Sequence, residues 1–117
     1  MSETFKFDMI ITIINNGFSD IVMEAARAAG ARGGTILHAR GSVGEEMKRF
    51  FGVTIDPEKE VVLILTTHEK RTTMMKAIGE AAGLRSDAHG LSFSVPVDDV
   101  VGITGAISEF SDDSTDN

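Results

Sequence analysis

Residues 60–67 of the chain read EVVLILTT, with an unbroken aliphatic run from Val61 to Leu65. A short run of β-branched and aliphatic residues is typical of a β-strand. Successive side chains of a strand point to opposite faces, so Val61, Leu63 and Leu65 lie opposite Val62 and Ile64. An antiparallel sheet with one face in water alternates apolar and polar residues instead. The pattern therefore predicts a strand that needs cover on both faces.

Three further segments predict strands. They are residues 5–14 (FKFDMIITII), 34–39 (GTILHA) and 91–97 (LSFSVPV). The first is also apolar on both faces, with Phe7, Met9, Ile11 and Ile13 opposite Ile10 and Ile14. Proline cannot donate a hydrogen bond to a neighbouring strand, so the proline of the last segment favours an edge position or a bend.

Two segments have the spacing of helices. The first begins at Ser19, the expected N-cap, and stops at Gly30. The second covers residues 69–82, with Thr67 as a cap and Gly83 as its end. The expected inward residues are Ile21, Val22, Ala25, Ala26 and Ala29 of the first helix and Met74, Met75, Ile78, Ala81 and Ala82 of the second.

The order of these elements is that of an α+β, ferredoxin-like βαββαβ sandwich, in which both helices cover the same face of the sheet. The other face is then an apolar surface of a size that is unusual on a soluble monomer. We therefore expect an oligomer whose sheets pack face to face. The alternative is a monomer that covers this face with its own loop and C-terminal strand.

Composition limits the classes of function. The chain has 117 residues, enough for one domain, and a formal net charge of −7, which is unfavourable for a general nucleic-acid binder. It has no cysteine, which excludes disulfides, thiolate metal sites and a cysteine nucleophile. The N-terminus lacks the pattern of a signal peptide, and no apolar run is long enough to insert in a membrane. We expect a cytoplasmic protein with an acidic, disordered tail at 108–117.

Three stretches in this order resemble the PII signal-transduction proteins and, more closely, their PII-like relatives. They are AGARGGTILHARGS (29–42), PEKEVVLIL (57–65) and HGLSFSVPVDDVVGITG (89–105). The resemblance implies a single domain over residues 1–107 that assembles as a homotrimer. It also implies a regulatory sensor rather than an enzyme, with ATP, ADP or AMP bound between subunits. A flexible T-loop at about 42–58 would dock on a membrane transporter or a metabolic enzyme.

The resemblance also implies ligand-binding residues. Gly41, Ser42 and Val43 match the turn that contacts the base and ribose, with Thr35 and Ile13 near the adenine. Lys59 matches a phosphate-contacting lysine, for which a simple strand-end lysine is the alternative.

One more candidate follows from residue chemistry, and another follows from the resemblance. Arg40 offers a guanidinium for bidentate contact with an anion, or for a surface salt bridge. His89 and Gly90 end a loop, LRSDAHG, which replaces a second phosphate loop of the family and whose backbone N–H groups could cradle phosphate.

The chain departs from the family in several places. Val101 and Ile103 stand where the family has two arginines, which weakens a triphosphate site. The chain has no tyrosine and no glutamine, which removes tyrosine nucleotidylation and the loop glutamine of the 2-oxoglutarate site. The loop nevertheless offers anchors and charges for partner docking, unless its phenylalanines fold into the core: Met47, Lys48, Arg49, Phe50 and Phe51. Ser42 and Glu45 have the spacing of a capping box, which predicts a short helix up to Phe51.

Two other functions remain open. A phosphohydrolase would need a nucleophile beside a base, and only the turn-like pair Asp98 and Asp99 offers carboxylates close together. A metal-tolerance trimer of the CutA type would need ligands, but His38, His68 and His89 have no metal-like spacing. We therefore expect no resident metal.

Overall fold

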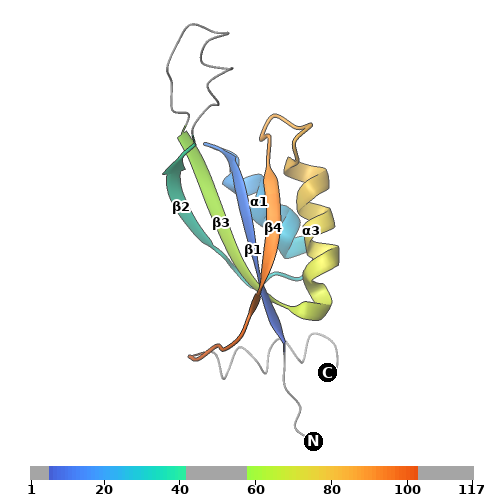
Figure 1. Cartoon of the computed structure of the whole chain (residues 1–117). Helices are drawn as coiled ribbons and strands as arrows, with labels where there is room; N and C mark the ends of the chain where they lie inside the picture. The colour runs from blue at the N-terminus through green and yellow to red at the C-terminus, as the bar shows by residue number, and fades with distance from the viewer. Residues whose placement is uncertain (1–5, 42–57, 103–117) are drawn as a thin grey trace, which may run out of the picture.

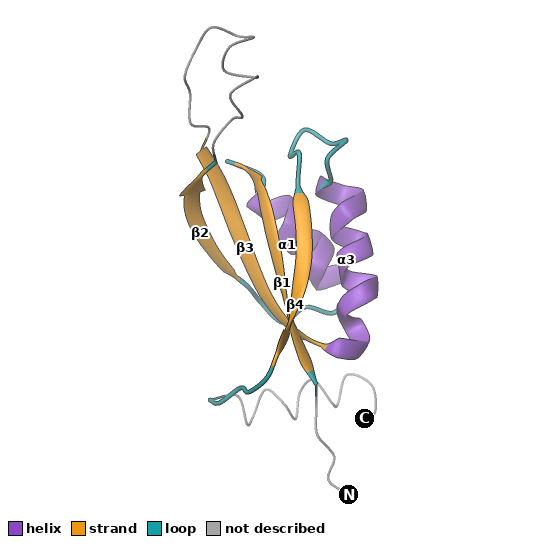
Figure 2. Cartoon of the chain, in the orientation of Figure 1, coloured by secondary structure: helices purple, strands orange, loops and turns teal. Residues whose placement is uncertain are grey.

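The computed structural model describes residues 6–41 and 58–102 of the chain. Its elements are β1 (Phe7–Asn15), α1 (Ser19–Ala28), β2 (Thr35–Arg40), β3 (Glu58–Thr67), α3 (His68–Ala82) and β4 (Leu91–Val97). All four predicted strands and both predicted helices are present. The strands form one antiparallel sheet in the order β2-β3-β1-β4 (Figure 1). Both helices lie on one face of it (Figure 2), as the ferredoxin-like pattern predicts.

The core lies between the helices and the sheet. Its fully buried side chains come from the two central strands, the inner faces of both helices and the loop after α3: Ile10, Ile14, Val62, Ile64, Val22, Ala26, Met74, Ile78, Ala82 and Ala88. Ile21 is 40% exposed, so its predicted inward position is wrong. Met23 is buried in its stead, because α1 packs its other side toward Gly34 at the start of β2.

The start of α1 also differs from the prediction. Ser19 is the first helical residue, Phe18 is the N-cap, and no side chain of the cap makes a hydrogen bond. Instead the buried Glu60 of β3 accepts hydrogen bonds at Oε1 from the backbone N–H groups of Gly17, at 3.1 Å, and Ser19, at 3.2 Å. A carboxylate from the sheet thus satisfies donors that a helix leaves unpaired and suits the positive end of the helix.

The ends of the helices follow the sequence more closely. Gly30 has φ of +110°, and Ala31 N–H and Gly30 N–H donate to the carbonyls of Ala26 and Arg27. This is the Schellman arrangement that a glycine stop favours. Thr67 is at the N-cap of α3 as expected, but its side chain makes no capping hydrogen bond.

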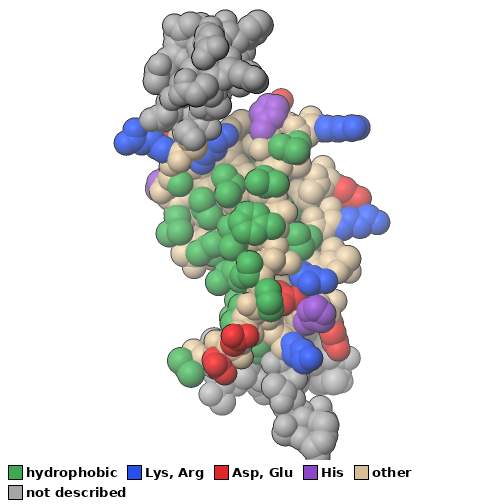
Figure 3. Space-filling model, viewed as in Figure 1, with side chains coloured by type: hydrophobic (Ala, Val, Ile, Leu, Met, Phe, Trp, Pro, Cys, Tyr) green, Lys and Arg blue, Asp and Glu red, His purple; other side chains and the backbone are tan. Residues whose placement is uncertain are grey.

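The face of the sheet away from the helices is apolar across all four strands. Register partners share a face, which places ten side chains together on what we call the open face: Leu37, Met9, Ile11, Ile13, Val61, Leu63, Leu65, Leu91, Phe93 and Val95. Figure 3 shows this continuous apolar surface. Leu91 is 53% exposed and Phe93 is 41% exposed. Residues 42–57 and 103–117, which would have to cover it in the monomer alternative, lie outside the described residues.

The capping role of Glu60 gives a direct test. Glu60→Ala is expected to lower the free energy of unfolding by about 1–3 kcal/mol, because two backbone N–H groups lose a charged acceptor. Ser19→Ala is the matched control and should change it by less than about 0.5 kcal/mol. Urea denaturation at one protein concentration measures both. A larger loss for Ser19→Ala would restore serine as the cap.

Candidate functional site

The apolar open face ends at a polar row. Its last apolar row runs through Leu37, Val61, Ile13 and Leu91, and the next row pairs Lys59 of β3 with Asn15 of β1. Lys59 Nζ donates a 2.7 Å hydrogen bond to Asn15 Oδ1. We call this region, with Arg40 and the loop 84–90, the polar end of the sheet. Figure 3 shows basic side chains at this edge, beside the apolar surface.

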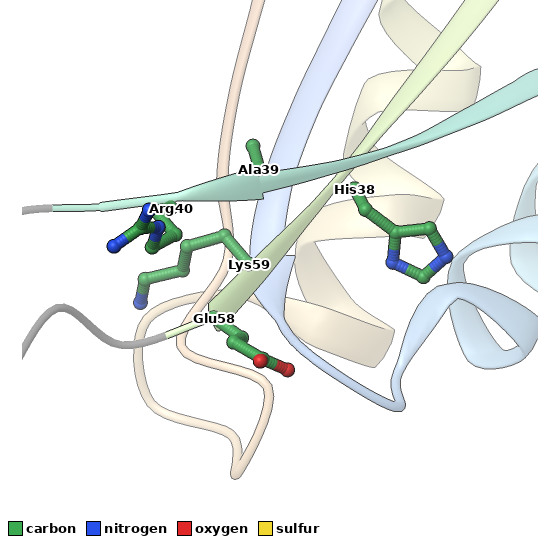
Figure 4. Close-up of a pocket in the computed structure, with 5 residues that line it drawn as sticks. All are labelled: His38, Ala39, Arg40, Glu58 and Lys59. Carbon is green, nitrogen blue, oxygen red and sulfur yellow. The ribbon is translucent and has the colours of Figure 1, made fainter.

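An open cavity of about 440 Å³ lies at the polar end, on the β2–β3 pair. Five residues line it: His38, Ala39, Arg40, Glu58 and Lys59. In Figure 4 the charged ends of Arg40 and Lys59 lie toward the strand ends, whereas the His38 ring lies farther along β2 and the Glu58 carboxylate points away from both cations. The volume of this cavity is in the range of small-molecule binding sites, about 300–1,000 Å³.

The structure brings together three of the predicted ligand residues. Arg40 and Lys59 share the cavity, and Gly41 lies against the lysine stem, since a Cβ there would be 3.1 Å from Lys59 Cε. Thr35 and Ile13 lie on the open face but are register partners of Leu63 and Val61 respectively. They are thus separated by the whole of β3, about 10 Å at the usual strand spacing. One chain alone does not bring them to a common ligand.

The loop 84–90 is held by its own hydrogen bonds. The N–H groups of Ser86, His89 and Gly90 donate to the carbonyls of Gly83, Ser86 and Ala82, and Ala88 N–H donates to Ser86 Oγ. Four of the N–H groups expected to cradle a phosphate are therefore already paired within the chain. His89 has φ of +49°, and its Nδ1 lies 3.1 Å from the carbonyl oxygen of Leu84.

Asn15 is a residue that sequence reasoning missed. Its Oδ1 accepts the hydrogen bond from Lys59, and its Nδ2 donates to the carbonyl of Asp87 at 3.2 Å. Its backbone N–H donates to the carbonyl of Ala88 at 2.9 Å. The sequence showed only a strand end at residues 15–17, NNG. The one signal that could have found it is a carboxamide placed where an apolar strand ends.

A scan against models of protein families finds no match, and a search of curated proteins finds none. Among solved structures, a PII protein of Arabidopsis thaliana bound to citrate matches with a TM-score of 0.64 and 22% sequence identity, over 86% of this chain and 82% of that chain. A protein of Thermus thermophilus assigned as PII-like signalling matches with a TM-score of 0.60 and 14% identity, over 79% of this chain and 86% of that chain.

The chain has the fold of PII signalling proteins. The segment that was predicted to form a T-loop lies outside the described residues, and so do seven predicted site residues: Ser42, Val43, Met47, Lys48, Arg49, Phe50 and Phe51. The predicted helix up to Phe51, Ile103 and the acidic tail lie outside them too. Val101 is 92% exposed at a position where the resemblance places an arginine.

The three histidines lie in different parts of the PII fold. His38 is on β2 as the register partner of Glu60, and His89 is in the loop 84–90. His68 begins α3, with its Nδ1 2.7 Å from Oδ2 of the buried Asp8, which Arg71 also approaches at 3.6 Å. Within residues 6–41 and 58–102, no three side chains of metal-ligating type form a group. No helix in these ranges is both long and apolar enough to span a membrane.

Gly90 has a structural role that a substitution would reveal. A Cβ there would lie 2.1 Å from the carbonyl oxygen of Ala82, which accepts the N–H of Gly90 itself. Gly90→Ala is therefore expected to lower the unfolding free energy by more than about 2 kcal/mol, since backbone must move. Gly33→Ala, with nothing within 4 Å of the new Cβ, is the control and should be neutral or slightly stabilising. Thermal unfolding of both variants measures the difference, and an unchanged midpoint for Gly90→Ala would contradict the close packing.

Proposed function

We propose that this chain is a PII-like regulatory sensor. It binds a small anionic ligand at the polar end of the sheet, where copies of the chain meet, and it controls a partner through the segment 42–57. The observation that carries the proposal is the pair of cations, Arg40 and Lys59, in a cavity at the two roots of that segment. A ligand held there touches residues on either side of the segment, Arg40 before it and Lys59 after it, so its binding can select one arrangement of the segment over others.

The open face supports assembly as a homotrimer. Its apolar side chains stay partly exposed in one chain, and packing against copies removes them from water. The same assembly offers a way for Thr35 and Ile13 to share a ligand, although β3 separates them within one chain. In a cleft between subunits, one copy supplies one of these residues and a neighbouring copy supplies the other.

The cations of the site define the ligand class. Arg40 and Lys59 line the cavity and favour carboxylates and phosphates. The Arabidopsis thaliana PII protein is bound to citrate, which is such an anion. An adenine nucleotide combines negative charge with a flat apolar base that suits the adjoining open face. The resemblance places an arginine where this chain has Val101, and the loss of that cation favours a ligand with fewer phosphates.

The partner remains the class that the resemblance implies, a membrane transporter or a metabolic enzyme in the cytoplasm. The proposal includes neither a catalytic step nor a resident metal. The phosphohydrolase alternative predicts phosphate release from ATP, and the metal-tolerance alternative predicts metal in the purified protein. Both are simple to measure on the preparation that is used for ligand binding.

Assembly through the open face predicts the effect of one charge. Phe93→Lys is expected to convert the trimer into monomers at low micromolar concentration, because it places an ammonium in an apolar interface. Ile21→Lys is the matched control, since Ile21 is 40% exposed and Phe93 is 41% exposed, but Ile21 lies on α1. Sedimentation velocity distinguishes the species. A wild-type chain that sediments as a stable monomer would refute the assembly.

Ligand binding predicts the effect of removing one cation. Isothermal titration of the full chain with ATP, ADP, AMP and citrate should show binding of at least one of them. Lys59→Met should weaken that binding by about tenfold or more, since a charged contact contributes roughly 1.5–3 kcal/mol. Lys76→Met, an exposed lysine on α3, should leave the affinity unchanged. Absence of heat with all four compounds would remove the sensor hypothesis in this form.

A further inference from the structure

We propose that Asn15 is a positioning residue that holds the Lys59 ammonium for an anionic ligand and couples its capture to the loop 84–90. This inference rests on the proposed function for its ligand, but the coupling between Lys59 and the loop is a property of the ligand-free chain. The coupling makes the loop 84–90 a second segment that responds to a ligand at the polar end, in addition to the segment proposed to control a partner.

Three hydrogen bonds meet at Asn15. Its Oδ1 accepts from Lys59 Nζ at 2.7 Å, its Nδ2 donates to the Asp87 carbonyl at 3.2 Å, and its backbone N–H donates to the Ala88 carbonyl at 2.9 Å. An ammonium only donates and a carbonyl only accepts, so the two partners fix which end of the carboxamide faces which. The planar side chain therefore links β3 to the loop rigidly.

Few other side chains could make this link. Aspartate keeps an acceptor for Lys59 but brings a second negatively polarised oxygen to the Asp87 carbonyl, and its charge competes with a ligand for the ammonium. Leucine keeps the size and removes both hydrogen bonds. Lysine has three N–H donors, and Asn15 takes one of them, which aims the others. With Gly41 against its stem, the lysine is held from two sides.

The link transmits a change at Lys59 to the loop 84–90. An anion that binds the other N–H donors of Lys59 shifts the ammonium relative to Oδ1 and so alters the hold of Nδ2 on the Asp87 carbonyl. The loop is built from short local hydrogen bonds around Ser86, so a change at Asp87 alters the protection of its amides. A ligand at Lys59 is thereby sensed in the loop that ends at Gly90.

The coupling is tested first without ligand, by hydrogen exchange of the Ala88, His89 and Gly90 amides in the full chain. Lys59→Met and Asn15→Leu should each speed exchange of these amides several-fold, and the double variant should add nothing beyond the single ones. Asn16→Leu, at the exposed neighbouring asparagine, should have no effect. Unchanged exchange in Lys59→Met overturns the coupling. If Asn15→Leu fails to fold, Asn15→Asp takes its place, with Asn16→Asp as its control.

The second arm uses citrate and ADP as probes. In the wild type either anion should change exchange of the three loop amides. Asn15→Asp should weaken binding about tenfold or more and abolish that change, with an unfolding midpoint close to that of Asn16→Asp. Wild-type affinity in Asn15→Asp and Asn15→Leu overturns the positioning role. If the wild type binds neither anion, the ligand half of the inference fails with the proposed function, while the exchange data still decide the coupling.

Discussion

The fold and the proposed assembly of this chain both depend on burying a sheet that is apolar on its two faces. The helices cover the face that carries Ile10, Ile14, Val62 and Ile64, all of which are fully buried. The opposite face keeps its leucines, isoleucines and Phe93 partly in water. Full burial of one such side chain contributes roughly 1.5–3 kcal/mol. The half-exposed residues on the four strands therefore gain several kcal/mol of hydrophobic free energy when another copy covers the open face. Association costs roughly 4–15 kcal/mol in lost translational and rotational freedom, and burial of the open face can offset this cost.

The position of the ligand site follows from where this apolar surface stops. Row by row along the sheet, aliphatic pairs continue up to Ile13 and Val61, and the next pair is Asn15 and Lys59. A lysine can stand at this point because its stem packs on the apolar row while its ammonium reaches polar partners. A compound with a flat apolar part and an anionic part matches that boundary better than either a fully apolar or a fully charged compound.

Sequence patterns predicted the structural features that depend on residues close together in the sequence. The strands, the helices, the Gly30 stop and the edge position of β4 all follow from local spacing and from glycine and proline chemistry. The errors and omissions concern long-range contacts. Glu60 caps a helix that begins about forty residues earlier, so the serine beside the helix start was the natural but wrong choice. Asn15 and Lys59 are similarly far apart in sequence, and only the register of β1 with β3 brings them together.

The charge of the chain adds a further constraint on recognition. The net charge is −7, and Glu109, Asp112, Asp113 and Asp116 add to it beyond β4. Such a chain does not attract anions over long distances, and at physiological ionic strength charges act over only about 8 Å. An anion must therefore be selected by contact, through few cations in good geometry. This makes the fixed placement of a single ammonium more important than the number of lysines on the surface, and a carboxamide that holds it is a direct way to fix it.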